Sequence, residues 1–305
     1  MRRQAILLMG PTGAGKSALA LELVERLPVE IVSVDSALVY RGMDIGTAKP
    51  AAAVRARITH HLIDIRDPAT SYSAGEFVRD AVLAMQDIWA RGLQPLLVGG
   101  TMLYFHALTD GIAELPTADP SLRAAIDAEA ARVGWPVLHE ELARVDPEAA
   151  GRIHANDPQR IQRALEVFRL TGETITELRR RRVSPLTDVR MIELAMAPAE
   201  RSVLHTQIER RFTGMLAAGL LEEVRGFYRR GDLSREHPSM RAVGYRQLWQ
   251  HLAGCATLAE ATKQAIAATR QLAKRQVTWL RRRPAARWLD TMRMDGTPSI
   301  IEALL

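Results

Sequence analysis

The amino-terminal third of the chain alternates between short apolar runs and segments of helical periodicity. Residues 5–9 form a continuous apolar run with the length of a buried strand, and residues 30–36 and 95–101 have the pattern of two further short strands. Apolar residues recur at the spacing of one helix face over residues 19–27, and again over residues 77–88. Strands that alternate with helices predict an α/β fold in which helices flank a parallel sheet.

The pattern changes between residues 115 and 188, which are predicted to be helical and are rich in arginine. Prolines stand where four of these helices are expected to begin: Pro120, Pro136, Pro147 and Pro158. Residues 189–196 then have the pattern of a strand that returns to the first domain. We therefore predict a core made of residues 1–114 and 189–305, with an all-helical insertion domain over residues 115–188.

The first predicted strand and helix are joined by Gly10-Pro11-Thr12-Gly13-Ala14-Gly15-Lys16-Ser17, which fits the phosphate-binding P-loop G-x-x-x-x-G-K-[ST]. Glycines let the backbone wrap around a phosphate group, and the amides at the start of the helix point toward its oxygens. Lys16 adds a positive charge, and the hydroxyl of Ser17 is the usual ligand of Mg²⁺. The strand before this loop and the helix after it favour phosphate binding over an ordinary glycine-rich turn.

Polar residues mark the ends of the second and third of these strands: Asp35 and Thr101. Because ligands of an open α/β sheet bind outside the carboxyl ends of its strands, we expect Asp35 near the P-loop. A cap or a structural ion pair is the alternative role for Asp35, as a helix N-cap is for Thr101. Nucleotide hydrolases often carry a Walker B aspartate at such a strand end. This chain has Gly99-Gly100-Thr101 there, which allows a ligand to approach the backbone.

The charge of the chain indicates a polyanionic partner. The 305 residues carry a formal net charge of +6, for which a generally basic surface is the alternative explanation. Residues 269–283 contain six basic residues and no acidic one, with Trp279 among them, and could follow a phosphate backbone. Arg160 and Arg163 share one face of another predicted helix, where a solvated helix face is the alternative.

The histidines and the single cysteine predict neither a metal cluster nor a disulfide. His60 and His61 are adjacent, so they point to opposite sides of any strand, and no third ligand is spaced to join them. Cys255 has no second cysteine to pair with and suits a reducing compartment. The apolar run after Arg2 and Arg3 is too short for a signal peptide, and no stretch is long enough to span a bilayer. We expect a cytoplasmic protein.

These residues alone predict a P-loop protein that acts on or near a polyanion, with a kinase or ATPase as the default interpretation. Seven segments, however, resemble the bacterial tRNA dimethylallyltransferases, and they follow the order of that family across nearly the whole chain. They are residues 10–17, 35–50, 60–64, 98–104, 157–166, 241–247 and 269–276. Gly13-Ala14 stands where relatives often have Ala-Ser, a change that a loop binding through backbone amides tolerates.

The resemblance implies a particular reaction. Enzymes of this family move a dimethylallyl group from dimethylallyl diphosphate to the exocyclic amine of the adenosine 3′ of the anticodon. The P-loop then holds the diphosphate with Mg²⁺ on Ser17, and Arg211 adds a further contact to the diphosphate. Asp35 is the expected acceptor of the amine proton, and Thr101 helps to stabilise the leaving group. The adenine is expected to flip out of the anticodon loop to reach the donor.

The same resemblance implies that the anticodon stem-loop binds between the core and the helical insertion. The residues implied to contact tRNA are Asp35, Ser36, Ala37, Leu38, Thr101, Arg123, Gln159, Arg160, Ile161, Gln162, Arg163, Arg241, Ala242, Val243, Gly244, Tyr245 and Arg246. We expect a monomer that uses Mg²⁺ and binds ATP without useful hydrolysis, because no residue is evident to orient a water at a γ-phosphate. A small P-loop kinase and a non-catalytic RNA-binding module are the two alternative functions.

Overall fold

The computed structural model describes residues 3–291, and these fall into two units. The first unit contains the described residues up to His106 and from Leu186 onwards, and the second unit is Ala107–Pro185. Each unit has its own cluster of buried apolar side chains. The second unit begins and ends a few residues before the limits 115 and 188 that the sequence pattern indicated.

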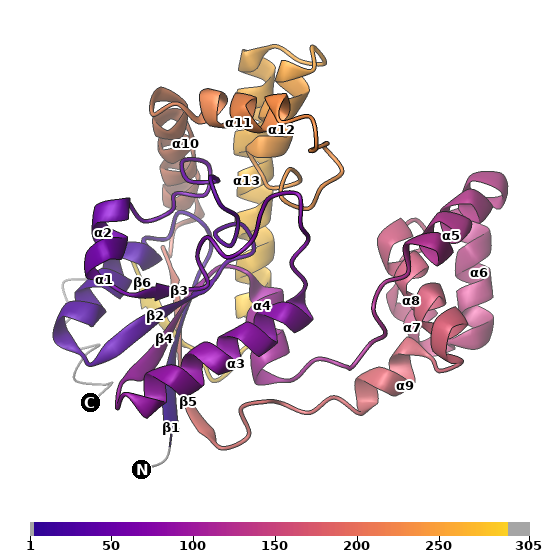
Figure 1. Ribbon diagram of the computed structural model, residues 1–305, viewed down its shortest axis with the longest axis horizontal. Helices are drawn as coiled ribbons and strands as arrows, with labels where there is room; N and C mark the ends of the chain where they lie inside the picture. Colours follow the sequence, from indigo (N-terminus) through magenta and orange to yellow (C-terminus); the bar gives the residue numbers. More distant parts are fainter. Residues whose placement is uncertain (1–2, 292–305) are drawn as a thin grey trace. The chain divides into compact units, whose positions relative to one another are not determined.

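A six-stranded parallel sheet forms the centre of the first unit, with the strand order β3-β2-β4-β1-β5-β6 (Figure 1). β1 lies between β4 and β5, and its residues 5–9 are buried, which explains their continuous apolar run. Helices flank this sheet, so the predicted α/β fold is confirmed. The strands are β1 Arg3–Met9, β2 Val29–Val34, β3 His60–His61, β4 Gln94–Gly99, β5 Val189–Ala197 and β6 Arg287–Asp290.

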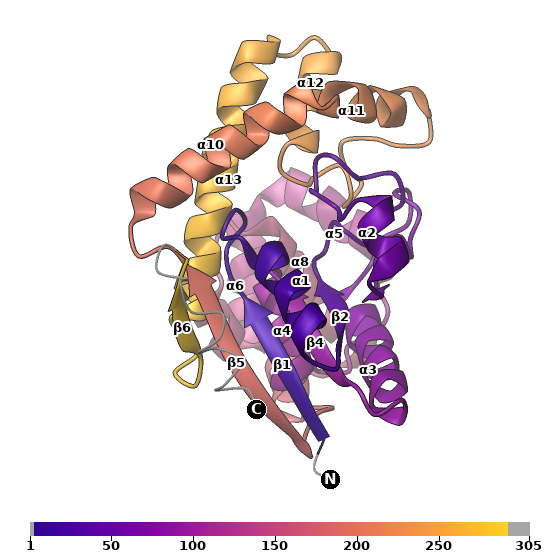
Figure 2. The ribbon, with the colours of Figure 1, turned by 90° about the vertical axis from the view of Figure 1, so that its left-hand side faces the viewer.

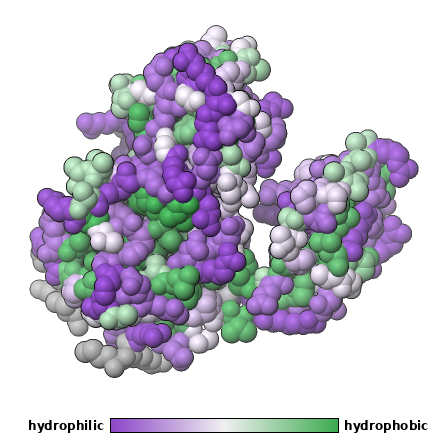
Figure 3. Space-filling view, in the orientation of Figure 1, coloured by the Kyte–Doolittle hydropathy of each residue, from purple (hydrophilic) through white to green (hydrophobic). Residues whose placement is uncertain are grey.

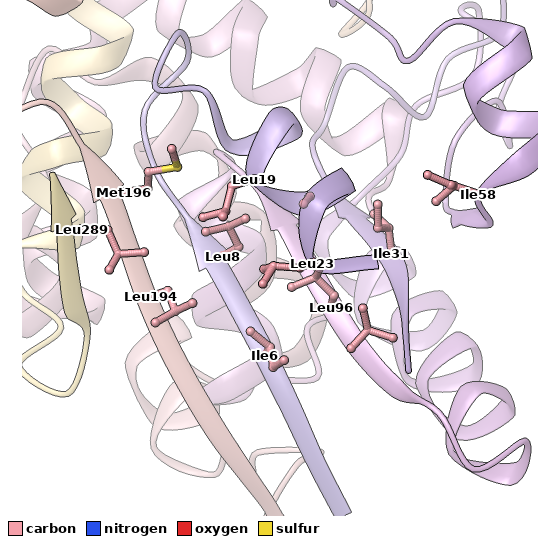
Figure 4. Packing of buried hydrophobic residues seen from close by; sticks show 12 residues of the cluster. Ile6, Leu8, Leu19, Leu23, Ile31, Ile58, Leu96, Leu194, Met196 and Leu289 are labelled. Carbon is pink, nitrogen blue, oxygen red and sulfur yellow. The ribbon is translucent and has the colours of Figure 1, made fainter. Parts of the chain in front are cut away.

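Helix α1 (Lys16–Arg26) packs the apolar residues Leu19, Ala20 and Leu23 against one face of this sheet (Figure 4). Burying one such aliphatic side chain contributes about 1.5–3 kcal/mol. The cluster therefore fixes the start of α1, and with it the loop before α1, on the sheet. The strand residues that belong to the same buried cluster are Ile6, Leu8, Val29, Ile31, Leu96, Leu194, Met196 and Leu289.

The other helices of the first unit extend beyond the sheet. α3 begins with a capping box, in which Ser73 and Glu76 each accept the backbone amide hydrogen of the other. α10 and α13 pack on each other through Leu204, Ile208 and Ala273, and Figure 2 shows them crossing beyond the carboxyl ends of β1 and β5. These helices are α2 Ala52–Arg57, α3 Ala74–Ala90, α4 Met102–Thr109, α10 Arg201–Ala217, α11 Leu220–Arg229, α12 Tyr245–Leu252 and α13 Leu258–Leu280.

The strand order brings the segments that the sequence marked to one edge of the sheet. β2, β4 and β1 are neighbours and run parallel, so the residues that follow them emerge side by side. These residues are Asp35 after β2, Gly100 and Thr101 after β4, and the P-loop after β1. Gly99 allows β2 and β4 to approach closely, since a Cβ at this position would lie 2.0 Å from the carbonyl oxygen of Val34.

The second unit is made of helices, as predicted, and the four prolines lie at helix starts. Prolines occupy the first turns of α5 to α8, and Asp119, Asp146 and Asp157 each cap one of these helices. Gly172 follows α8 in the left-handed conformation, with a φ of 73°. The helices are α5 Pro120–Val133, α6 Trp135–Val145, α7 Pro147–Arg152, α8 Pro158–Thr171 and α9 Ile175–Arg180.

Hydrophilic residues dominate the face of each unit that Figure 3 shows, and apolar residues gather there in small patches. Within residues 3–291, no helix is both long and apolar enough to cross a membrane. One large exposed apolar side chain is Trp279 of α13, which is 41 % exposed and stands edge-on to His106. Single exposed apolar residues are usual, but an aromatic ring beside a cavity can hold a ligand.

Candidate functional site

Residues 10–17 form a P-loop in geometry as well as in sequence. Gly13 and Gly15 occupy the left-handed region, with φ values of 84° and 81°, where other residues are strained. Gly15 is the N-cap of α1, and the first turn of this helix carries no acidic side chain. A helix N-terminus whose amides are not capped by side chains attracts an anion. The loop therefore has the structure of an anion-binding site.

Lys16 strengthens this anion site with a positive charge. Its Nζ donates a hydrogen bond to the carbonyl oxygen of Pro11 at 2.8 Å. Burial lowers the pKa of Lys16 from 10.5 to about 8, while the negative charge of Asp35 raises this pKa and the positive charge of Arg211 lowers it. A bound phosphate group would supply a close negative charge and restore a higher pKa. An anionic ligand therefore stabilises the protonated form of this lysine.

Asp35 follows β2 with one carboxylate oxygen engaged in the local turn. Its Oδ1 accepts hydrogen bonds from the amides of Ala37 at 2.8 Å and Leu38 at 3.4 Å. Among residues 3–291, neither a hydrogen bond to Oδ2 nor an ion pair of Asp35 is found. Within the described residues, Asp35 therefore forms no structural ion pair, and its Oδ1 caps the turn that follows β2. The turn orients the carboxylate and leaves Oδ2 available to a ligand.

Thr101 connects the end of β4 to the end of β2. Its Oγ1 accepts the amide hydrogen of Ser36 at 3.0 Å and donates to Oγ of Ser36 at 3.4 Å. The amide of Thr101 also donates to the carbonyl oxygen of Val34 at 3.2 Å. In the described part of the chain, this hydroxyl bonds Ser36 rather than the amides of α4, so it does not serve as a side-chain cap of that helix. These bonds hold Thr101 and Asp35 at a fixed spacing.

Arg211 reaches from α10 to the P-loop. Its Nη1 donates a hydrogen bond to Oγ1 of Thr12 at 3.1 Å, and its Nη2 donates to the carbonyl oxygen of Thr47 at 3.4 Å. Burial lowers the pKa of Arg211, and the charge of Asp35 raises it. A guanidinium stays protonated at neutral pH in proteins. Arg211 therefore places a second positive charge beside the phosphate loop.

The loop that presents Thr47 is held by Glu223 of α11. The carboxylate of Glu223 accepts the amide hydrogens of residues 44–46 at 2.9, 2.7 and 3.1 Å, and it also accepts the hydroxyl hydrogen of Tyr245. Gly46 leaves no room for a side chain, because a Cβ at this position would lie 2.5 Å from the ring of Tyr245. The carbonyl group that the guanidinium of Arg211 contacts is fixed in this way.

Two cavities of the first unit meet at these side chains. The smaller cavity, of about 210 Å³, is lined by Lys16 and Ser17, and the larger one, of about 540 Å³, is lined by Thr101 and residues 241–243. Ligands bound in the two cavities would therefore have their reacting ends close to the residues that belong to both. The residues shared by the two linings are Thr12, Asp35, Thr47, Gly100, Arg211 and Gln276.

The smaller cavity combines an anion-binding end with an apolar wall. His60 also lines this cavity, and its Nδ1 bonds the carbonyl oxygen of Ile58 at 2.8 Å. Burial lowers the pKa of His60, so its ring is neutral at pH 7. A phosphate ester that carries a short hydrocarbon chain matches this combination. The aliphatic residues of the wall are Ala20, Leu21, Ile31, Leu38, Val54, Ile63 and Val98.

The residues of the smaller cavity also fit a magnesium ion. Mg²⁺ prefers oxygen ligands, and it keeps several waters beside one or two carboxylates and the phosphates of a substrate. Ser17 contributes a hydroxyl to the cavity lining. The buried hydroxyl of Ser33 lines it as well and has no hydrogen-bond partner among the described residues. This donor set suits a metal whose other ligands come from a diphosphate and water.

The structure places most of the predicted residues of the first unit at the larger cavity. Ser36 and Ala37 line this cavity, whereas Leu38 lines the smaller one and is thereby separated from the other residues implied to contact tRNA. Gly244, with a φ of 95°, precedes α12, and Arg246 is exposed on that helix. The lining residues within 241–246 are Arg241, Ala242, Val243 and Tyr245.

In the second unit, two of the predicted arginines surround a buried carboxylate. Arg123 donates to both oxygens of Glu166, at 2.9 and 3.1 Å, and Arg163 donates to one of them at 2.6 Å. Burial raises the pKa of Glu166, but the hydrogen bonds from the two arginines outweigh that effect and leave the pKa below its usual value. Glu166 is therefore ionised at neutral pH and holds both arginine side chains in place.

The other predicted residues of the second unit differ in exposure. Gln159 and Arg160 are exposed at the start of α8, and the side chain of Arg160 is 71 % accessible. Gln162 donates a hydrogen bond to Oδ1 of Asp127 at 2.6 Å. Ile161 is 0 % exposed and packs in the core of this unit, so a side-chain contact of Ile161 with RNA is corrected to a packing role.

Sequence reasoning missed two residues that organise the site, Gln276 and Glu223. Gln276 belongs to both cavity linings and ends the segment 269–276 that resembles the family, but nothing in that segment shows which residues it contacts. Glu223 lies in a short amphipathic helix with no motif around it. Contacts between segments so far apart in the chain leave no local pattern.

Comparisons with known proteins assign the chain to a family. Residues 38–283 match the IPP transferase family. The tRNA dimethylallyltransferase of Nitrosococcus oceani is 59 % identical over 295 residues, which cover 97 % of this chain and 94 % of that protein. That of Bordetella pertussis is 54 % identical over 304 residues, which cover 99 % of this chain and 97 % of that protein.

Solved structures are similar over the whole length. The full-length tRNA isopentenylpyrophosphate transferase from Bacillus halodurans has a TM-score of 0.72 and 37 % identity, and the match covers 99 % of this chain and 94 % of that one. A eukaryotic dimethylallyltransferase acting on tRNA has a TM-score of 0.83 and 25 % identity, with 99 % and 78 % covered. The chain belongs to the IPP transferase family.

Proposed function

We propose that this protein is a tRNA dimethylallyltransferase, which moves the dimethylallyl group of dimethylallyl diphosphate to N6 of the adenosine 3′ of the anticodon. The observation that carries this proposal is the junction of the two cavities. A phosphate loop with an apolar wall lies on one side, a wider cavity lies on the other, and Asp35 lines both. Membership of the IPP transferase family and the names of the relatives support the same reaction.

The donor occupies the smaller cavity. Its diphosphate binds the free amides at the start of α1 and the ammonium group of Lys16, with Arg211 beside the loop. Its five-carbon chain lies along the aliphatic wall, which excludes water from the allylic carbon. A nucleoside triphosphate gains little from such a wall. The apolar lining therefore favours an isoprenoid diphosphate over ATP as the productive ligand.

The acceptor amine enters from the larger cavity, and Asp35 accepts its proton. The lone pair of an adenine amine is delocalised into the ring, so the amine is a weak nucleophile. As the bond between N6 and the allylic carbon forms, the N6 proton passes to Oδ2 of Asp35. Oδ1 remains bonded to the amides of Ala37 and Leu38, so the turn keeps the carboxylate oriented throughout.

The leaving diphosphate is stabilised by the residues that bind it. As the bond between the allylic carbon and oxygen breaks, the electron pair stays on the bridging oxygen and negative charge grows there. Lys16, Arg211 and the loop amides are fixed before the reaction, so they stabilise this charge without reorganising. When bound at Ser17, Mg²⁺ would supply Lewis-acid stabilisation of the same charge.

The larger cavity suits a base that has left its stack. Enzymes that modify a base extrude it from the nucleic acid into a pocket. Thr101 and Tyr245 line this cavity beside Asp35, and the exposed ring of Trp279 at its lining offers a surface for stacking. Arg241 and Arg275 add positive charge for the RNA backbone.

The direct test of this function is product analysis. Purified protein is incubated with unmodified tRNA, Mg²⁺ and dimethylallyl diphosphate, and the nucleosides are then analysed by mass. The expected result is a gain of one five-carbon unit on the adenosine 3′ of the anticodon. Unmodified adenosine under these conditions would contradict the proposal, and steady ATP turnover with a nucleoside acceptor would favour a kinase.

A further inference from the structure

Gln276 of α13 bridges the two strand ends that the proposed reaction must keep in register. Its Oε1 accepts the amide hydrogen of Thr12 in the P-loop at 2.9 Å. Its Nε2 donates to the carbonyl oxygen of Gly100, next to Thr101, at 2.7 Å. The carboxamide thus uses one acceptor and one donor to join the loop after β1 to the segment after β4.

The backbone around this bridge is shaped to receive it. A Cβ on Gly100 would lie 2.5 Å from Nε2 of Gln276, so the glycine makes room for the carboxamide. The bond to the Thr12 amide also engages a loop N–H group that would otherwise be available to a phosphate oxygen. Gln276 is half-buried and belongs to the linings of both cavities. It therefore lies where donor and acceptor would meet.

We propose that Gln276 is a positioning residue for prenyl transfer. The inference rests on the proposed function: the P-loop holds the leaving group, and the segment of Gly100 and Thr101 borders the acceptor. A single carboxamide that bonds both segments sets the distance between the two reacting partners. Misplacement of reacting groups by about 1 Å can cost about 100-fold in rate, so a link of this kind acts on the chemical step.

Only a side chain with both an acceptor and a donor at this reach makes the bridge. A glutamate would keep an acceptor for the Thr12 amide, but it would place a carboxylate oxygen against the carbonyl oxygen of Gly100. A methionine would keep the length and approximate bulk and lose both hydrogen bonds. Gln276→Glu and Gln276→Met therefore distinguish the effect of losing the hydrogen bonds of the bridge from the effect of losing side-chain volume.

The test compares these two variants with Gln264→Ala, an exposed glutamine on the same helix. Single-turnover rates of prenyl transfer are measured at saturating dimethylallyl diphosphate and anticodon stem-loop, and Kd values are measured for each substrate. The expected result is a 10- to 100-fold lower rate in both Gln276 variants, with Kd values within about threefold of wild type. Gln264→Ala should react like wild type.

A double-mutant cycle and a binding-independent readout complete the test. If Gln276 acts through the segment of Thr101, adding Gln276→Met to Thr101→Ala should cost no more than threefold beyond the larger single loss. Amide-hydrogen exchange at Thr12, measured without ligands, should accelerate in Gln276→Met. Rates within threefold of wild type, fully additive losses, or a loss confined to Kd would overturn the proposal. A wild-type protein that transfers no prenyl group would instead refute the proposed function, and the positioning role with it.

Discussion

The affinity for dimethylallyl diphosphate is expected to fall as the pH rises through 8, because of Lys16. Burial lowers the pKa of this lysine to about 8 in the free protein. A bound diphosphate places negative charge beside it and should return the pKa to about 10.5. The pKa is thus higher in the complex than in the free protein. The contribution of Lys16 to binding is therefore complete well below pH 8 and is lost progressively as the pH rises from about 8 to about 10.5.

The size of the effect follows from these two pKa values. In the free protein, about a quarter of the Lys16 side chains are neutral at pH 7.5 and about nine tenths at pH 9. Because the complex forms with a protonated lysine, Kd should be about eightfold higher at pH 9 than at pH 7.5. This factor corresponds to about 1.2 kcal/mol of binding free energy at about 1.36 kcal/mol per decade.

Isothermal titration calorimetry at constant Mg²⁺ and ionic strength measures this dependence. Titrations in two buffers with different ionisation enthalpies should give an uptake of about half a proton per donor bound at pH 8. Lys16→Arg is the matched control, because an arginine stays charged over this range and should make Kd nearly independent of pH. A constant Kd for the wild type, or the same slope in Lys16→Arg, would show that the charge of Lys16 does not set the pH dependence of donor binding.

Three further predictions test other parts of the structure. Glu166→Gln should lower the free energy of unfolding by about 2–3 kcal/mol in denaturant titrations, because Arg123 and Arg163 lose their buried charged partner. The control variant at an exposed position, Glu140→Gln, should change this free energy by less than about 0.5 kcal/mol. Arg160→Ala should weaken binding of the anticodon stem-loop, measured by fluorescence anisotropy, because an exposed guanidinium can neutralise one phosphate. The slope of the logarithm of the binding constant against the logarithm of the salt concentration should fall in magnitude by about 1, and an unchanged slope would exclude that contact. Ser17→Ala should raise the Mg²⁺ concentration needed for half-maximal activity, and an unchanged Mg²⁺ titration would remove Ser17 from the metal site.

The elements of the first unit could be predicted because their signals are local. Residues 5–9 are buried between β4 and β5, and burial on both faces requires the continuous apolar run by which this strand was found. The P-loop was evident because glycine spacing and a lysine before a helix form one contiguous motif. The rule that ligands bind at the carboxyl ends of parallel strands then predicted that Asp35 would lie beside this loop.

The contacts that set the geometry of the site could not be predicted, because they join distant segments. Gln276 bonds Thr12 across 264 positions of the chain, and Glu223 bonds the amide of Ile45 across 178 positions. Neither the strand period nor the helix period carries such information. For Arg163 the charge pattern indicated a surface for RNA, whereas the structure pairs this residue with the buried Glu166. Helical periodicity identifies the face of an arginine but not its partner.

Asp35→Asn tests whether Asp35 accepts the proton of the adenosine amine. An asparagine keeps an acceptor oxygen for the amides of Ala37 and Leu38, so the turn should persist, but it cannot take the proton. The measurement is the single-turnover rate of prenyl transfer at saturating tRNA and dimethylallyl diphosphate, with the exposed Asp87→Asn as the matched control. We expect the rate to fall by about 10²–10⁴-fold, or about 3–5 kcal/mol of barrier, with donor affinity close to wild type. A rate within about threefold of wild type would contradict this role of Asp35, because the proton would then leave by another route.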